Sequence, residues 1–436
     1  MTQYVINIIL FSCITIPYAI LYIRKYKLTP VSTFLIMEMT MFYGICLFKS
    51  NKSTGTSPEA IKLESIYVVA LLFFIFGVEF SKRYKLRIRS KNITTLDRNN
   101  GGSALDTELS KNQMIVVWAV IILGVLLCTY YFIVGGANVF IIALRDFING
   151  SLSTYKAARA VYRTVTGSGY IYQFRVVLLP ILVTYLTFFS KKKYPKVITI
   201  PIFIFMIVSI VGTGQRNAFV FYTLIVILYY YFMKKKGIKF ISKAHFIFLG
   251  ICGLLMLVLL TIGNGRVNTE SNQFVGALDS IWSRVFEANQ GSAITAFRYI
   301  DTQKTVWGYD WIKMLGQVLP GKSDYLAVDN ISYFMDYGSY DGTNPPCLWG
   351  SAWYNFHIIG ITIYPFIIGM GMHNVYKTMR RKENKDRFYY LIYVALCVYF
   401  GIWTYGTPVS LFNHGIITLL ILRWIIFKVV KNKDTR

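Results

Sequence analysis

Residues 114–134, MIVVWAVIILGVLLCTYYFIV, form an apolar run without one charged side chain. A helix needs about 20 apolar residues to cross the roughly 30 Å of hydrocarbon in a bilayer. This run meets that length, with Lys111 shortly before it and Gly135 directly after it. We therefore predict that the stretch crosses a membrane as a helix.

Similar apolar blocks recur along the whole chain. Of its 436 residues, 55% are hydrophobic and only 15% are charged, whereas soluble domains carry about 25% charged residues. The predicted spans are 3–23, 31–48, 64–80, 114–134, 171–190, 196–212, 217–233, 244–262, 351–373, 388–404 and 409–428. The pattern predicts an all-α, polytopic integral membrane protein with about eleven transmembrane helices in a single membrane domain, 1–436.

Basic clusters follow every second span. They are Arg24–Lys27, Lys82–Lys91, Lys191–Lys193, Lys234–Lys236, Lys377–Lys382 and Lys428–Lys433. Cytoplasmic loops retain Lys and Arg, so we predict the N-terminus outside and the C-terminus in the cytoplasm. The same rule, with attraction to anionic lipid, accounts for the net charge of +26. We see no nucleic-acid-binding motif and expect no nucleic-acid partner.

Cysteine and histidine give no sign of a metal site or a disulfide framework. All 6 cysteines except Cys347 lie inside apolar blocks, where a thiol is usually a small packing group. The 4 histidines are scattered and no CxxC spacing occurs, so we expect neither metal nor cofactor. The stretch Tyr4–Ile23 lacks a basic n-region and a small-residue cleavage site, and we expect a retained span.

Two outside segments are too long to be turns. The first is Gly135–Tyr170, and the second, Gly263–Gly350, is the longest polar stretch of the chain. The second segment is rich in Trp, Tyr and Phe and holds many of the 20 acidic residues. Because aromatic side chains can bury a core, we predict that 263–350 is a folded extracytoplasmic loop subdomain.

The outside segments use arginine more than lysine. Their arginines are Arg145, Arg159, Arg163, Arg175, Arg216, Arg266, Arg284 and Arg298. A guanidinium matches phosphate oxygens in a bidentate way, whereas lysine acts as a point charge. We therefore predict an anionic ligand at the outer leaflet, such as a lipid-linked diphosphate. The alternative is that these arginines pair with the acids of the loop.

Arg175 and Arg216 are the strongest candidates for this ligand. Arg175 lies just inside span 171–190, where a guanidinium must face a cavity or a partner. Arg216 belongs to the turn Gly212–Asn217, GTGQRN, whose glycines let the backbone approach a ligand. Snorkelling to lipid headgroups is the alternative. Glu38, within span 31–48, is interpreted as a helix-packing or interfacial group.

Several stretches resemble the Wzy-type O-antigen and oligosaccharide repeat-unit polymerases. The likeness rests on GTGQRN at 212–217, Gly308-Tyr309, the Leu319–Lys322 stretch and the loop exit Trp349–Gly360, WGSAWYNFHIIG. It covers roughly residues 135–375 and the hydropathy of the whole chain. At the exit, Ser351 and Ala352 stand where that family often has a glutamate, and His357 where glycine is usual.

The resemblance implies a metal-independent, GT-C-like membrane glycosyltransferase in the bacterial inner membrane. Its substrate would be undecaprenyl-diphosphate-linked oligosaccharide, joined into O-antigen or capsule-like polysaccharide at the periplasmic face. Arg175, Arg216, Arg266 and Arg284 would hold the diphosphate, and a loop carboxylate or His357 would act as the base. A chain-length regulator and a flippase of the same pathway would be partners. The rivals are an O-antigen ligase and a lipid-linked oligosaccharide flippase or transporter.

Overall fold

The computed structural model describes residues 2–48, 57–84, 109–135, 168–190, 194–213, 216–234, 283, 287–316, 318, 325–338, 343–380 and 386–430. Within these ranges all regular structure is helical and no strand is present. The chain divides into two compact units. Unit 1 comprises Met1–Thr107, Phe286–Asp386 and Phe400–Ser410, and unit 2 comprises Glu108–Val285, Arg387–Tyr399 and Leu411–Arg436.

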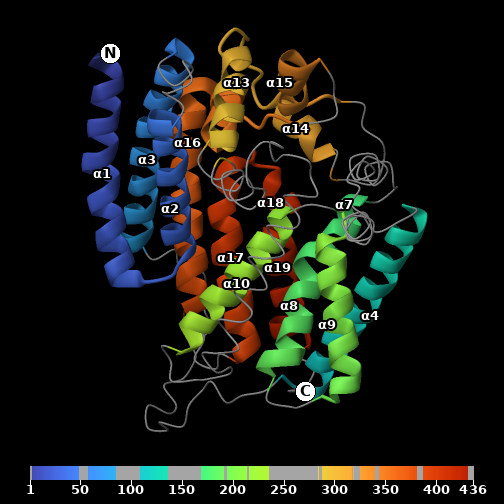
Figure 1. Ribbon diagram of the computed structural model, residues 1–436. Coiled ribbons are helices and arrows are strands. Elements are labelled where there is room, and N and C mark those ends of the chain that lie inside the picture. The colour runs from blue at the N-terminus through green and yellow to red at the C-terminus, as the bar shows by residue number, and fades with distance from the viewer. Residues whose placement is uncertain are drawn as a thin grey trace, which may run out of the picture. The chain divides into compact units, whose positions relative to one another are not determined.

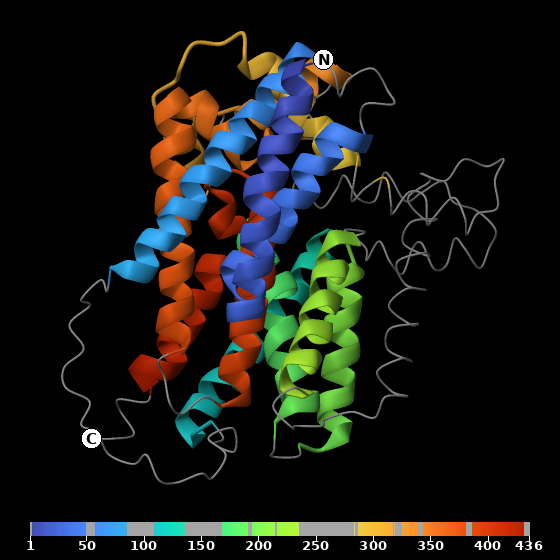
Figure 2. The ribbon, with the colours of Figure 1, turned by 90° about the vertical axis from the view of Figure 1, so that its left-hand side faces the viewer.

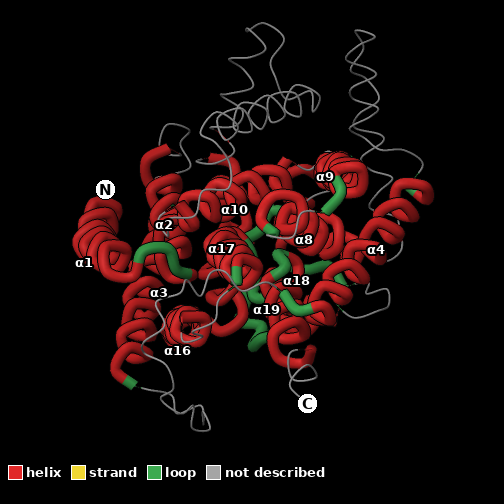
Figure 3. The backbone as a smooth tube through the Cα atoms, turned by 90° about the horizontal axis from the view of Figure 1, so that it is seen from below, coloured by secondary structure: helices red, strands yellow, loops and turns green. Residues whose placement is uncertain are grey.

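Unit 1 is built on four apolar helices. They are α1 (Thr2–Tyr26), α2 (Pro30–Tyr43, continued as a π-helix over Gly44–Phe48), α3 (Pro58–Arg83) and α16 (Cys347–Arg380). Three shorter helices, α13 (Asn289–Ile300), α14 (Tyr309–Gly316) and α15 (Val328–Tyr337), lie at the end of unit 1 where α1 begins (Figure 1). These four apolar helices, α1, α2, α3 and α16, are neighbours when seen end-on (Figure 3).

Glycine brings α3 and α16 into backbone contact. A Cβ atom added at Gly77 would lie 2.0 Å from the carbonyl oxygen of Phe366, and one added at Gly369 would lie 2.2 Å from that of Phe74. Helices in lipid gain little from the hydrophobic effect between themselves, so small residues that permit close packing are used at their interfaces. These two glycines therefore fix how closely α3 and α16 pack.

Helix α16 turns sharply at His357. This residue has φ 48° and ψ −128°, which no helical residue adopts. The segments on either side double back, because a Cβ at Gly360 would lie 2.1 Å from the carbonyl oxygen of Ala352. The first segment is buried in unit 1, and Trp349 is fully covered. The predicted span 351–373 therefore begins four residues too late and misses this turn.

Unit 2 holds α4 (Lys111–Val134), a run of mixed α- and π-helix over Ser168–Phe189, α9 (Lys196–Val211) and α10 (Arg216–Lys234). The run includes α8 (Leu179–Thr184), and α8, α9 and α10 stand side by side in Figures 1 and 2. Near the C-terminus are α17 (Arg387–Ile402), whose last residues belong to unit 1, and α19 (Ile416–Trp424).

The described helices confirm a helical membrane protein. Seven of them are long and apolar enough to cross a membrane, and Pro30–Cys46 and Lys196–Val211 are shorter apolar helices. Every predicted span except 244–262, which lies outside the described residues, coincides with helical segments. The count of about eleven spans stays a prediction. The last predicted span, 409–428, is interrupted at Gly415, whose φ is 78°.

Candidate functional site

A buried carboxylate, Asp310, lies in the first turn of α14. It is fully covered. Its Oδ1 accepts hydrogen bonds from the Tyr325 hydroxyl at 2.8 Å and the Val328 amide at 3.3 Å. Its Oδ2 has no hydrogen-bond partner. Burial raises the pKa of Asp310, although these hydrogen bonds act in the opposite direction.

A second carboxylate, Asp329, lies in the first turn of α15 and is partly exposed. The Asn330 amide donates to its Oδ1 at 3.0 Å. Burial and the nearby charge of Asp310 together raise the pKa of Asp329 to about 6. A base with a pKa near the working pH is the most effective proton acceptor. The pair thus supplies a group that can take a proton from a hydroxyl.

The start of α16 holds the beginning of α14, and with it Asp310, in place. The indole Nε1 of Trp311, next to Asp310, donates to the Ser351 hydroxyl at 2.8 Å. The Gly308 amide donates to the Asn355 carbonyl at 3.2 Å. Gly308 needs its left-handed φ of 82°, and a side chain there would strike the Phe356 ring. The stretches around 308–309 and 349–360 are therefore brought together.

His357, the histidine predicted as a base, lies at the turn of α16. Its ring centroid is 4.6 Å from that of Trp353. A non-glycine residue with positive φ is strained, and such residues concentrate at functional sites. Its catalytic role stays a prediction.

Arg175 is fully enclosed in unit 2. Its Nη1 donates to the carbonyl oxygens of Ser209 at 3.0 Å and Ile210 at 3.1 Å. These carbonyls belong to the last turn of α9, where the helix dipole favours a cation. An arginine inside a membrane requires a partner, and for Arg175 the backbone carbonyls at the end of α9 act as that partner. Arg175 thus anchors the helix end that leads into the turn 212–217.

Arg216 is the first residue of α10, and the structure describes its backbone only. The first amides of a helix lack intrahelical partners and attract anions, and the role of Arg216 toward a diphosphate stays a prediction. Arg266 and Arg284 lie outside the described residues. Among the residues that are described, no group of three or more His, Cys, Asp or Glu could hold a metal ion.

Sequence reasoning did not select the Asp310–Asp329 pair. It proposed a loop carboxylate without choosing among the acids of 263–350. The local signal was Asp310 between two aromatic residues, Tyr309 and Trp311, a context that suggests burial. The partner Asp329 could not be found this way, because contacts between separate loop helices bring the two acids together.

Comparison with known proteins found no matching family model, no similar curated protein and no similar solved structure. The fold itself defines the class, which is a helical membrane protein with several long apolar helices.

Proposed function

We propose that this protein is a membrane glycosyltransferase that joins undecaprenyl-diphosphate-linked oligosaccharide units into O-antigen or capsule-like polysaccharide. The proposal places it in the bacterial inner membrane with its N-terminus and the 263–350 loop on the periplasmic side. The alternating basic clusters of the sequence support this orientation.

The observation that carries the proposal is the Asp310–Asp329 pair, a partly exposed acid whose pKa is raised to about 6 by burial and by a neighbouring carboxylate. Glycan transfer needs a group that removes a proton from a sugar hydroxyl. The acceptor oxygen would attack the anomeric carbon of the growing chain. The bond from that carbon to the diphosphate oxygen would break, and Asp329 would take the hydroxyl proton.

The leaving diphosphate needs positive charge as it departs. We keep Arg216, the first residue of α10, as the arginine predicted for this task. Arg175 would contribute by holding the last turn of α9 in position. Aromatic side chains of the segment 263–350, such as the exposed Trp307 in the turn before α14, would offer stacking faces for sugars.

The test of this function is the surface glycan of a strain lacking the gene. We expect single repeat units on the core lipid in place of long chains, a one-rung pattern on a gel. A ligase would instead leave the core without any units while chains accumulate on the polyprenyl carrier. A flippase would strand the units on the cytoplasmic side. Either of these two patterns would contradict the proposal.

Arg216→Lys tests the diphosphate contact. Lysine keeps the charge but loses the planar fork, so we expect long chains to collapse to short ones. A charge-assisted contact contributes about 1.5–3 kcal/mol, or roughly ten- to a hundredfold in rate if it acts in the transition state. Chain length is read from a gel and protein level from a blot. Normal chains from a well-expressed variant would show that Arg216 contacts only lipid headgroups, where lysine serves equally well.

A further inference from the structure

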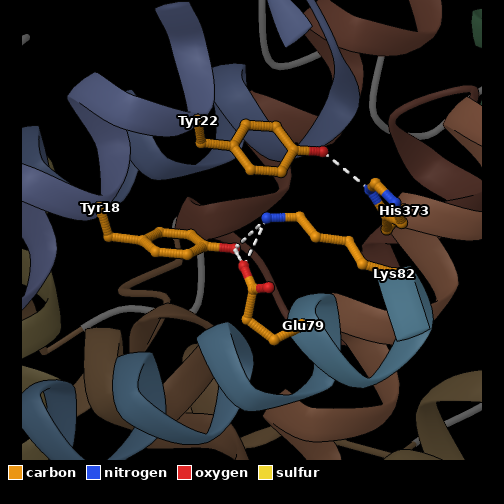
Figure 4. Close-up of polar contacts among 5 residues, drawn as sticks. All are labelled: Tyr18, Tyr22, Glu79, Lys82 and His373. Atoms are coloured by element: carbon orange, nitrogen blue, oxygen red, sulfur yellow. Dashed lines mark hydrogen bonds and ion pairs between the residues drawn. The ribbon is translucent and has the colours of Figure 1, made fainter. Parts of the chain in front are cut away.

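Unit 1 carries acidic side chains within its apolar helices. They differ in whether a positively charged side chain lies beside the carboxylate. Glu79 on α3 has a counter-ion, since it forms an ion pair with Lys82 and accepts a hydrogen bond from the Tyr18 hydroxyl at 2.8 Å (Figure 4). The Lys82 ammonium also lies 4.8 Å from the ring centroid of Tyr22. Figure 4 shows the Lys82 ammonium near the hydrogen bond between the Tyr22 hydroxyl and His373. Glu79 is therefore a charged carboxylate with a partner.

Glu38 on α2 has no such partner. It is fully buried, and the Trp349 indole Nε1 donates a hydrogen bond to its Oε2 at 2.7 Å. Its Oε1 has no hydrogen-bond partner. The ion pairs formed by the described residues do not include it. If the Glu38 carboxylate were ionised, it would therefore have no counter-ion.

The titratable side chains around Glu38 cannot supply that charge. They are Tyr67 on α3, Cys347 on α16 and Tyr405 beyond α17. Each is a weak acid that is neutral near pH 7 and would be negative if it ionised. The remaining polar neighbours, Trp349 and Thr404, are uncharged. No described residue packed against this part of α2 brings a cation to Glu38.

We propose that Glu38 is a proton-binding site, a neutral carboxylic acid held inside the apolar part of unit 1. A charged carboxylate buried in an apolar region without a counter-ion is strongly unfavourable, whereas a neutral acid avoids this penalty. The ligand is an exchangeable proton. This inference goes beyond the proposed glycosyl transfer and does not depend on it, because Glu38 and Asp329 lie on different helices with separate partners.

The surroundings suit a protonated acid. The Trp349 indole donates to Oε2, which would be the carbonyl oxygen of the neutral acid. The proton would then lie on Oε1, and the Thr404 hydroxyl is a polar neighbour of this carboxyl group. That hydroxyl donates its own hydrogen to the Gly401 carbonyl at 2.9 Å, so its lone pairs remain to accept one. Thr404 belongs to a 3₁₀ turn, Trp403–Tyr405, that follows the end of α17.

Infrared difference spectroscopy tests the proposal on the full chain at neutral pH. We expect the spectrum of the wild type minus that of Glu38→Gln to contain the carbonyl stretch of a protonated carboxylic acid. The band should move to lower frequency in D₂O, because the bound proton exchanges. The matched control is Glu79→Gln, whose difference spectrum should contain only the stretches of an ionised carboxylate, since Lys82 neutralises Glu79.

Trp349→Phe gives a second reading of the same group. Removing the indole donor should shift the acid carbonyl band to higher frequency, and this measurement remains available if Glu38→Gln does not fold. A difference spectrum in which Glu38 contributes carboxylate stretches at neutral pH would overturn the proposal. So would an acid band that does not respond to Trp349→Phe, since the acid would then be a different residue.

Discussion

Asp329→Asn is expected to lower polysaccharide polymerisation by about a hundred- to ten-thousandfold, the usual effect of removing a general base. Asparagine keeps the size of the side chain but cannot accept a proton from a hydroxyl. The measurement is the rate of chain growth on lipid-linked units in membranes of known protein content. Asp336→Asn is the matched control, because Asp336 lies exposed on the same helix. It should retain normal activity.

The pH dependence of the same activity gives an independent reading. Asp329 acts as a base only when deprotonated, and its pKa is raised to about 6, so the rate should rise as pH increases through about 6. The charge of Asp310 contributes to this raised pKa, although burial contributes more. Asp310→Asn should therefore move the acid limb of the profile to lower pH. An acid limb that stays unchanged in Asp310→Asn would contradict the assigned pair.

Gly369→Ala is expected to destabilise the folded protein severely, by about 3 kcal/mol or more, the upper end of the range for overpacked interiors. The added Cβ would lie 2.2 Å from the carbonyl oxygen of Phe74, and a backbone atom cannot move away as a flexible side chain can. Helices α3 and α16 would have to separate along their contact. Unfolding of the purified protein in mixed detergent micelles with increasing dodecyl sulfate measures the effect.

Gly371→Ala provides the comparison two residues further along α16. A Cβ atom at Gly371 would meet nothing within 4 Å, so the substitution should leave stability unchanged or raise it slightly. Alanine favours a helix over glycine by about 1 kcal/mol in soluble hosts. Equal stability of the two variants would contradict the assignment of Gly369 to a close helix contact.

The class of the fold could be predicted from the sequence because it follows from local chemistry. A run such as 114–134 has no charged side chain that must stay outside hydrocarbon, and a helix satisfies its own backbone. The long apolar helices among the described residues coincide with such runs, whereas α13, α14 and α15 lie in the polar segment 263–350. Helix ends were less predictable, and the start of α16 is an example. The stretch Cys347–Phe356 is apolar only in part, and it is helical because it packs inside unit 1.

The candidate site was only partly predictable. The sequence indicated that an arginine at position 175 needs a partner, but the partner is the end of α9, and a backbone carbonyl leaves no trace in a residue pattern. The sequence shows that the segment 263–350 is rich in acidic residues, but it does not show that Asp310 and Asp329 lie close together. The raised pKa of Asp329 arises from burial and from Asp310, and both are products of how α14 and α15 pack.

The sequence by itself determined that this protein is helical and crosses a membrane, because hydropathy and helix length are properties of contiguous residues. Only the tertiary structure decided which polar groups meet. Glu79 and Lys82 are three residues apart and pair along one helix. Glu38 and Trp349 are 311 positions apart and meet only because α2 and α16 pack together. Chemistry that depends on such distant contacts is set by the packing of the helices.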